Sequence, residues 1–202
     1  MKMNKTTPFL AGRDAQLAGI LAGPPFKAYH HSDLFLDLLE AITSQQLSGK
    51  AATTIFERFL DLFPSRQPTP RRVLALKPEK LRTAGLSRQK AGYLHNVAAF
   101  ALRHDLSRAA LRHLSDDEII ALLTQIKGVG RWTAEMLLMF PLDRPDVFPV
   151  DDLGIQLAIK NLYSLRGDGR RLHKRMIAIA ENWRPHRSLA CKYLWRWRST
   201  QR

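Results

Sequence analysis

The sequence contains a single cysteine, Cys191, among 202 residues. One cysteine excludes an intramolecular disulfide, a zinc site built mainly from cysteines and an iron–sulfur cluster held by four thiolates. No apolar run approaches the roughly 18 residues that a membrane-spanning helix needs, and residues 1–14 lack the apolar core of a signal peptide. We therefore expect a cytoplasmic protein whose chemistry uses side chains other than thiols.

Acidic residues are also scarce. The chain has 18 Asp and Glu against 32 Lys and Arg, which gives a formal net charge of +14 with histidine neutral. Residues 160–202 concentrate this excess, with twelve Lys and Arg against Asp168 and Glu181. Aromatic side chains are interspersed among these cations, namely Trp183, Tyr193, Trp195 and Trp197. Cations interleaved with aromatic rings favour a nucleic acid partner over a merely solvated surface.

The apolar residues recur with the period of a helix almost throughout, and the alternation typical of strands is nearly absent. Ten segments are predicted to be helical: 33–47, 48–63, 71–76, 78–84, 87–103, 116–126, 131–140, 152–163, 170–183 and 187–197. Ser115 and Glu118 form a capping-box pattern at the start of the sixth segment. The sequence therefore predicts an all-α fold, with residues 1–202 in a single domain.

The most specific segment is Leu122–Ala134, which reads as a helix, a Gly-Val-Gly turn and a second helix. Gly128 and Gly130 permit a sharp turn and leave the backbone bare, so that the amides of the turn and of the following helix can approach a phosphate. Such a contact holds a nucleic acid without reading its sequence. An ordinary turn between two helices is the alternative interpretation.

This hairpin, followed about twenty residues later by the aspartate-containing loop 141–153, resembles the helix-hairpin-helix DNA glycosylase superfamily. Two further strings, Ala41–Ser48 and Trp183–Ala190 with Trp195 beyond it, resemble the 3-methyladenine DNA glycosylase branch of AlkA type. The resemblance implies two helical lobes joined around the hairpin, with an active-site cleft between them. It implies a lobe over about 30–125, the hairpin and catalytic loop over 122–153, and basic C-terminal helices over 154–202.

Asp151 and Asp152 are the predicted catalytic pair. The resemblance places the catalytic carboxylate at the second position, so Asp152 is the primary candidate and Asp151 a helper or a helix cap. Breaking an N-glycosidic bond develops positive charge on the deoxyribose, and a nearby carboxylate can stabilise that charge or activate water. The alternative is that the two aspartates only cap the following helix.

Position 132 separates two reaction types, because superfamily members that also cleave the DNA backbone carry a lysine there that forms a Schiff base with the sugar. Trp132 therefore implies a monofunctional hydrolase without abasic-site lyase activity. The resemblance makes Trp132 and Trp195 walls of a pocket for the flipped base, where a cationic alkylated purine gains about 0.5–2 kcal/mol of cation–π energy. Met136 in this pocket replaces an aromatic residue of the family. Core packing is the alternative for each tryptophan.

The resemblance also implies the residues that hold DNA. One of Gln46 and Leu47, next to Gln45 at a helix end, is expected to fill the space that the flipped nucleotide leaves. The remaining contacts are expected from Gly128, Gly130, Arg131 and Arg187. The family's hairpin further implies a monovalent cation on the backbone carbonyls of Thr124, Ile126 and Val129. No organic cofactor and no membrane partner is expected.

The sequence thus predicts a monomeric glycosylase that hydrolyses the N-glycosidic bond of alkylated purines, such as 3-methyladenine and 7-methylguanine, in duplex DNA during base excision repair. Two alternatives remain. A relative acting on deaminated or oxidised bases is compatible with Met136, and a non-catalytic module could use the same hairpin and basic tail to bind DNA. The combination of Asp152 with Trp132 and Trp195 favours the enzyme.

Overall fold

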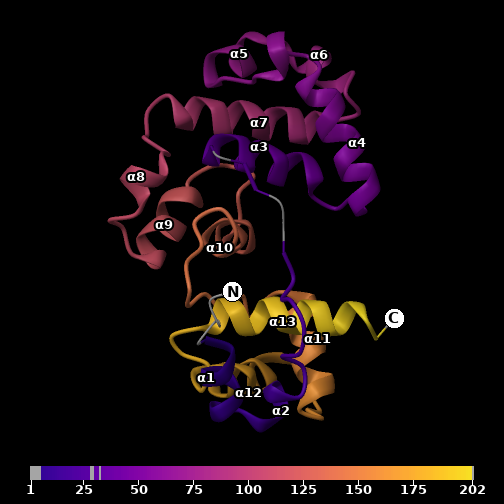
Figure 1. The fold of residues 1–202 in the computed structure, drawn as a ribbon. Helices are drawn as coiled ribbons and strands as arrows, with labels where there is room; N and C mark the ends of the chain where they lie inside the picture. The colour runs from indigo at the N-terminus through magenta and orange to yellow at the C-terminus, as the bar shows by residue number, and fades with distance from the viewer. Residues whose placement is uncertain (1–5, 28–29, 32, 202) are drawn as a thin grey trace. The chain divides into compact units, whose positions relative to one another are not determined.

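The computed structural model describes residues 6–27, 30–31 and 33–201. Within these ranges every regular element is a helix, which confirms the predicted all-α class (Figure 1). None of the described helices is both long enough and apolar enough to cross a bilayer. The chain forms two compact units: unit 2 is His30–Leu137, and unit 1 joins the residues before it to those from Leu138 onward.

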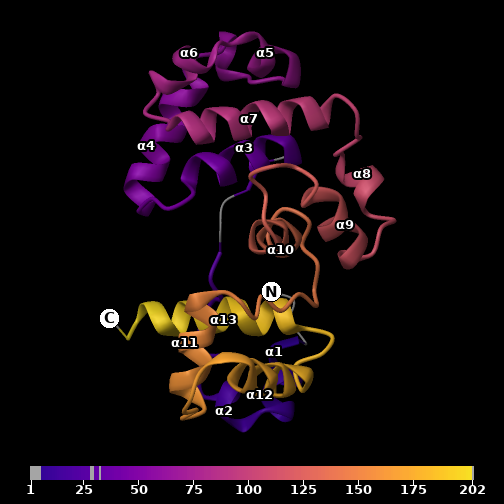
Figure 2. The ribbon, with the colours of Figure 1, turned by 180° about the vertical axis from the view of Figure 1, so that it is seen from behind.

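Unit 2 is built around the longest of its helices, α7. Its elements are α3 (Leu34–Ser44), α4 (Gly49–Leu60), the 3₁₀ turn η1 (Pro64–Arg66), α5 (Pro70–Ala75), α6 (Pro78–Arg82), α7 (Arg88–Ala101), α8 (Arg108–Leu111), α9 (Asp116–Leu123) and most of α10 (Arg131–Met139). Helix α7 packs against α3, α5 and α6, and α3 packs against α4 (Figure 2). The predicted capping box opens α9, where Ser115 and Glu118 each accept the backbone N–H of the other.

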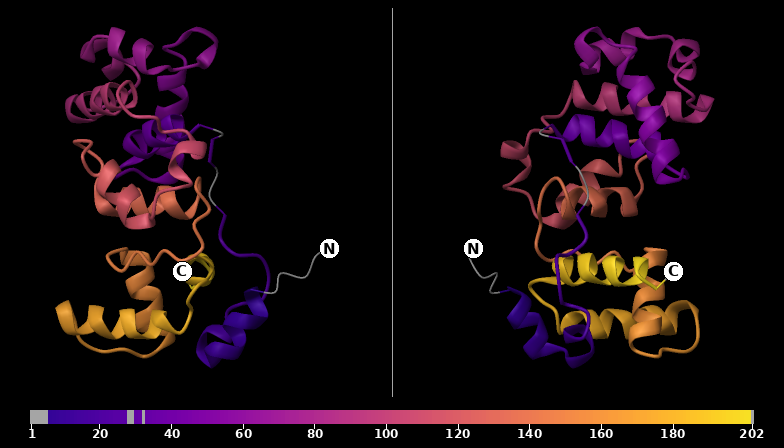
Figure 3. Two further views of the ribbon diagram at one scale, coloured as in Figure 1. Left: turned by 90° about the vertical axis from the view of Figure 1, so that its left-hand side faces the viewer. Right: turned by 45° about the vertical axis from the view of Figure 1, so that its right-hand side comes forward.

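Unit 1 combines the two ends of the chain. It contains α1 (Thr6–Arg13), α2 (Ala15–Ala18), α11 (Leu153–Leu162), α12 (Gly169–Glu181) and α13 (Arg187–Ser199), and Figure 3 shows α1 and α2 beside the C-terminal helices. Asp14 makes this connection: its Oδ1 caps α2, and its Oδ2 accepts the Tyr163 hydroxyl at 2.6 Å and the Trp183 indole N–H at 2.9 Å. Burial and the bond to Asp14 raise the pKa of Tyr163 above its usual range.

The structure departs from the predicted helices at several helix ends and in three short helices. Helices α4 and α9 each end three residues before their predicted ends. Helix α3 ends at Ser44 instead of reaching residue 47, because Gln46 adopts a φ of 57° and the Lys90 ammonium caps the helix end by donating to the carbonyls of Thr43 (2.8 Å) and Gln45 (2.7 Å). Helices α1, α2 and α8 were not predicted, since segments this short owe their helical state to packing rather than to their own periodicity.

Candidate active site

Asp152 begins α11 as its N-cap. Its Oδ1 accepts the backbone N–H of Ile155 at 2.8 Å and the indole N–H of Trp195 at 2.9 Å. Two donors from different helices fix the direction of the half-buried carboxylate. The helix cap considered as an alternative is therefore present, and Asp152 makes it instead of Asp151. Capping and catalysis are compatible, because the cap itself orients the carboxylate.

Gly154 lets Trp195 come this close to Asp152. A Cβ at position 154 would lie 3.0 Å from Asp152 Oδ1 and 3.1 Å from the nearest Trp195 ring atoms. Both distances are tighter than ordinary van der Waals contact, so any side chain at this position would push the indole or the carboxylate aside. Sequence reasoning missed this residue, and its only signal was a glycine in the first turn of a helix, where glycine is otherwise unfavourable.

Aromatic rings surround Trp195 within unit 1. Phe140 stacks on the indole with a centroid distance of 5.8 Å. Phe26 packs edge-on against both rings, with centroid distances of 6.0 Å to Phe140 and 6.1 Å to Trp195. Phe26 is 43% exposed and Trp195 is partly exposed, so this cluster reaches the surface of the unit. Ring faces next to a carboxylate suit a flat, positively charged group. Neither phenylalanine was among the predicted pocket residues.

Loop 141–152, which leads into Asp152, is held by an ionic clamp centred on Asp146. The guanidinium of Arg187 donates to both carboxylate oxygens of Asp146, at 2.8 and 3.0 Å, and to its backbone carbonyl at 2.7 Å. Arg184 adds a bond of 2.6 Å to the same carboxylate. The Arg187 side chain is only 14% exposed, and its positive charge is paired with the carboxylate of Asp146. Arg187, predicted as a DNA contact, thus binds Asp146.

Ser188 completes this attachment. Its Oγ accepts the N–H of Val147 at 2.9 Å and donates to the carbonyl of Arg144 at 2.7 Å, and only 2% of the residue is exposed. The buried Trp183 anchors the same string through Asp14. The string Trp183–Ala190 therefore positions the loop that carries Asp152, which gives this part of the resemblance a structural reason.

His173 of α12 lies beside the predicted catalytic pair. Its Nδ1 is 3.7 Å from the exposed carboxylate of Asp151, and its Nε2 is 3.0 Å from Nε2 of Gln156, which also donates to the carbonyl of Val150 at 2.8 Å. The amide nitrogen of Gln156 can only donate, so His173 Nε2 must accept its hydrogen bond. This hydrogen-bond network assigns the proton of the neutral imidazole to Nδ1, which faces Asp151. Nothing in the sequence pattern distinguishes His173 from the other histidines.

The two glycines of the hairpin in unit 2 differ in their surroundings. Gly128 has a φ of 111°, and a Cβ there would lie 2.4–2.8 Å from atoms of Tyr93. Gly130 lies outside the left-handed region, and a Cβ there would meet nothing within 4 Å. The conformation of the turn therefore requires glycine at 128, whereas at 130 the structure has room for a side chain.

Neutral hydrogen bonds hold the hairpin in place. The Gln45 amide donates to the carbonyl of Gly128 at 3.0 Å, and the Asn96 amide donates to the carbonyl of Lys127 at 3.1 Å. Gln45, predicted as a DNA contact, thus binds the hairpin itself. Gln46 and Leu47 are exposed at the turn that follows α3, with Leu47 37% exposed.

Helix α10 starts directly after the hairpin and presents three predicted residues. The Arg131 side chain is 62% exposed, and its Nε donates to the buried Glu135 at 2.9 Å. Trp132 is 47% exposed, which contradicts a role in core packing of unit 2. Met136 is half-buried one helical turn after Trp132. Trp132 and Met136 thus belong to unit 2, whereas Trp195 and Asp152 belong to unit 1.

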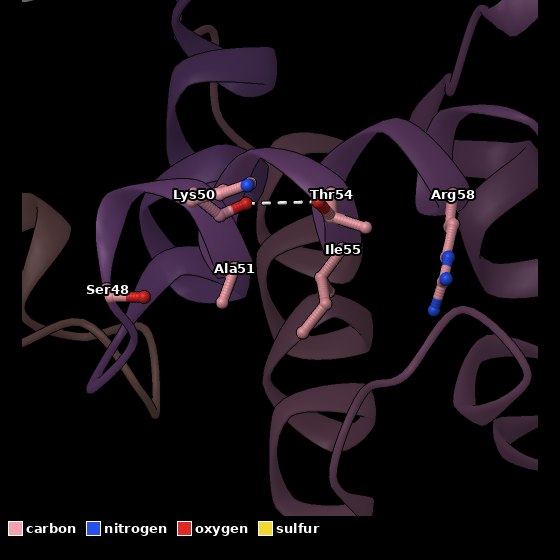
Figure 4. Close-up of a pocket in the computed structure, with 6 residues that line it drawn as sticks. All are labelled: Ser48, Lys50, Ala51, Thr54, Ile55 and Arg58. Atoms are coloured by element: carbon pink, nitrogen blue, oxygen red, sulfur yellow. Dashed lines mark hydrogen bonds between the residues drawn. The ribbon is translucent and has the colours of Figure 1, made fainter.

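A shallow hollow of about 420 Å³ lies along α4, directly after Leu47. It is lined by Ser48, Lys50, Ala51, Thr54, Ile55 and Arg58 (Figure 4). The Thr54 hydroxyl is occupied by the carbonyl of Lys50 at 3.0 Å, so the cations Lys50 and Arg58 give the hollow its polar character. Sequence reasoning did not include these residues, because basic residues on an exposed helix face carry no specific signal.

No group of three or more His, Cys, Asp or Glu side chains that could hold a metal occurs in the part of the chain that the structure describes. The predicted cation ligands are backbone carbonyls instead, which suit monovalent cations. The carbonyl of Ile126 accepts the N–H of Val129 at 2.9 Å and keeps its second lone pair for another partner. The hairpin is therefore compatible with such a cation.

Residues 39–185 match the family described as HhH-GPD superfamily base excision DNA repair protein. DNA-3-methyladenine glycosylase 1 of Schizosaccharomyces pombe is 36% identical over 174 residues, which cover 85% of this chain and 75% of the relative. Putative DNA-3-methyladenine glycosylase YfjP of Bacillus subtilis is 34% identical over 79% of this chain and only 57% of the relative.

Among solved structures, that of the 3-methyladenine DNA glycosylase Mag1 from the same yeast in complex with abasic DNA is similar with a TM-score of 0.83 and 34% identity. The match covers 96% of both chains. The helical fold is thus shared with a solved glycosylase. The chain belongs to the HhH-GPD superfamily of base excision DNA repair proteins.

Proposed function

We propose that this protein is a DNA glycosylase that releases alkylated purines from duplex DNA. The observation that carries this proposal is the carboxylate of Asp152, oriented by the indole of Trp195 and the amide of Ile155 at the edge of an aromatic cluster. The relatives are named for 3-methyladenine, and one was solved with abasic DNA, the product of base removal. A bound cationic base would make cation–π contacts with the aromatic rings and an electrostatic contact with the carboxylate of Asp152.

In the proposed reaction the C1′–N bond breaks and the departing base keeps the bonding electron pair. A base that is methylated at N3 or N7 carries a positive charge, so it leaves as a neutral molecule without prior protonation. The carboxylate of Asp152 stabilises the positive charge that develops on the deoxyribose. Water then forms the new bond to C1′, and its proton passes to Asp152 or to solvent.

The remaining roles are assigned from exposure and position. The hairpin amides near Gly128 and Gly130, with the exposed guanidinium of Arg131, hold a phosphate, and a monovalent cation on the carbonyls of Thr124, Ile126 and Val129 would add positive charge there. Either Gln46 or Leu47 fills the space of the flipped nucleotide. Trp132 in place of a lysine leaves the enzyme without lyase activity.

The proposal is tested by incubating the protein with duplexes that contain 3-methyladenine, 7-methylguanine, hypoxanthine or 8-oxoguanine. We expect release of the two cationic purines, with strand breaks only after alkali treatment. Faster release of the neutral lesions would assign the enzyme to deaminated or oxidised bases. Strand breaks without alkali would contradict the monofunctional mechanism. Release of none of these bases would favour the alternative of a non-catalytic DNA-binding module.

A pair of variants tests the catalytic residue. Asp152→Asn preserves the shape of the side chain and removes its charge, so we expect single-turnover base release to fall by at least about 10²-fold, with duplex affinity nearly unchanged. Asp151→Asn is the matched control and should retain most of the activity. Equal activity of the Asp152 variant and the wild type would exclude the assignment, and the reverse ranking would move the role to Asp151.

A further inference from the structure

A group of arginines in unit 1 has no part in the proposed base removal. Arg166, Arg171 and Arg175, which we call the arginine patch, surround a pocket of about 250 Å³ together with Gly167, Asp168 and Leu172. All three arginines are exposed. The contact of 3.4 Å from Arg175 Nη1 to the carbonyl of Arg166 links two of them, and in the residues that the structure describes none of the three has a carboxylate within ion-pair distance.

Other cations of the same unit are used differently. Arg184 and Arg187 bind Asp146 and Glu181, and Lys192 lies 3.6 Å from Asp143. Residues 160–175, in contrast, hold six Lys and Arg and one carboxylate, that of Asp168. Arg171 and Arg175 are one helical turn apart, where like charges destabilise a helix. A bound anion would remove this repulsion.

The arginine patch points away from the predicted catalytic pair. His173, which contacts Asp151, lies on the same helix, two residues from both Arg171 and Arg175. At about 100° per residue, each arginine is about 160° around the helix axis from His173. DNA whose nucleotide reaches Asp152 therefore meets the opposite side of α12 from the patch.

The composition of the pocket favours a polyanion over a protein partner. Leu172, the only large apolar residue in its lining, is 5% exposed, so the pocket offers no apolar anchor of the kind that dominates protein interfaces. Guanidinium groups match phosphate oxygens with two parallel hydrogen bonds, and the three arginines outnumber the carboxylate of Asp168. A Cβ at Gly167 would meet nothing within 4 Å, which leaves the backbone accessible beside them.

We propose that the arginine patch binds the phosphate backbone of a second segment of duplex DNA, separate from the segment that contains the base at Asp152. The protein then holds two duplexes at once and can pass from one to the other without first dissociating into solvent. This inference goes beyond base excision, since the second contact needs no lesion and no chemistry.

The test compares the variant Arg166→Gln/Arg171→Gln/Arg175→Gln with the control Arg71→Gln/Lys80→Gln/Arg82→Gln, which removes the same charge from exposed positions of α5 and α6. Two undamaged duplexes with different fluorophores report bridging by energy transfer. We expect the wild type and the control to bridge the two duplexes, and the patch variant to bridge them at least about tenfold less. The slope of the logarithm of the affinity against the logarithm of the salt concentration should be smaller in magnitude by about three in the patch variant, because three phosphate contacts are lost.

Two further measurements separate this inference from the proposed function. Single-turnover base release from a damaged duplex of about 12 base pairs, roughly 40 Å long, should stay within twofold in the patch variant, which also shows that this variant is folded. If the wild type releases no base, the proposed function fails while the bridging assay still decides the patch, with circular dichroism then reporting the fold.

Four outcomes would overturn the inference. The first is a wild type that does not bridge, and the second is a patch variant that bridges like the control. The third is an equal loss of bridging and of base release from the short duplex, because the arginines would then serve the catalytic DNA segment. Displacement of the second duplex by polyglutamate as effectively as by unlabelled duplex would also contradict a nucleic acid site and indicate an acidic polypeptide.

Discussion

The hairpin of unit 2 and the loop 141–152 of unit 1 are both irregular segments, and each carries part of the proposed function. The hairpin is held by neutral groups, namely the amides of Gln45 and Asn96 and the ring of Tyr93 against Gly128. The loop is held mainly by charge, through the carboxylate of Asp146 between two guanidiniums, with neutral hydrogen bonds to Ser188 in addition. Shape therefore controls the hairpin and electrostatics controls the loop, so different substitutions should disrupt them.

The largest effect is expected at Gly128. Gly128→Ala combines an unfavourable φ with a clash against Tyr93, so we expect the free energy of unfolding to fall by about 3 kcal/mol, a loss of roughly 10 °C in Tm for a chain of this size. Gly130→Ala is the matched control, expected within about 0.5 kcal/mol of wild type, with a loss of duplex affinity. Urea denaturation measures the first quantity and fluorescence anisotropy the second.

The double variant Gly128→Ala/Tyr93→Ala sharpens this test. Removing the ring relieves the clash and leaves the backbone strain. The free energy of unfolding lost on changing Gly128 to Ala should therefore be smaller in the Tyr93→Ala background than in the wild type. Equal stability of the two single glycine variants would show that the hairpin is not held by shape.

An intermediate effect is expected for the clamp. Arg187→Ala leaves the carboxylate of Asp146 partly buried with a weaker set of partners, so we expect a loss of about 2 kcal/mol in stability and about tenfold in single-turnover base release. Arg66→Ala in unit 2 is the control, because Arg66 and its partners Glu57 and Asp61 are all about half exposed and each such pair contributes about 0.5 kcal/mol or less.

A double-mutant cycle with Asp146→Ala isolates the pair. If Asp146 and Arg187 act as one clamp, the double variant should lose much less than the sum of the two single losses. Additive losses, or a cycle that affects stability without affecting base release, would contradict a role of the clamp in positioning Asp152.

The smallest effect concerns one carboxylate in each unit, the half-buried Asp14 and the buried Asp37. Asp14 of unit 1 accepts four hydrogen bonds, whereas Asp37 of unit 2 accepts the N–H of His31 with Oδ1 and leaves its buried Oδ2 without a partner. Burial raises the pKa of Asp37 above its ordinary value of 3.8. The unfolded chain therefore ionises first as pH rises, and the folded state loses stability from about pH 4 upward.

Asp37→Asn removes this penalty and keeps the acceptor for His31. We expect the variant to be more stable than wild type by about 1 kcal/mol at pH 7, with the difference vanishing below about pH 4. Asp14→Asn should instead destabilise the protein at pH 7. Urea unfolding at both pH values measures these differences, and a destabilised Asp37→Asn protein at pH 7 would refute the assignment.

The sequence by itself determined the features whose physical cause lies within a few residues. The helical period gave the all-α class, the spacing of Ser115 and Glu118 gave the start of α9, and Gly128 gave the hairpin turn. The preference of aspartate for a helix start also predicted a cap at the pair Asp151 and Asp152, and the structure places it on Asp152. Each of these depends on local backbone geometry, which nearby residues control.

The tertiary structure decided which distant side chains meet. It brought Asp14 to Trp183, placed the amide of Gln45 on the hairpin, and paired Arg187 with Asp146. These pairings join residues from 41 to 169 positions apart, and a charged or amide side chain looks the same in sequence whether it faces solvent, DNA or a buried partner. Only packing determines which of these environments each side chain occupies, because burial and partner geometry arise when the helices come together.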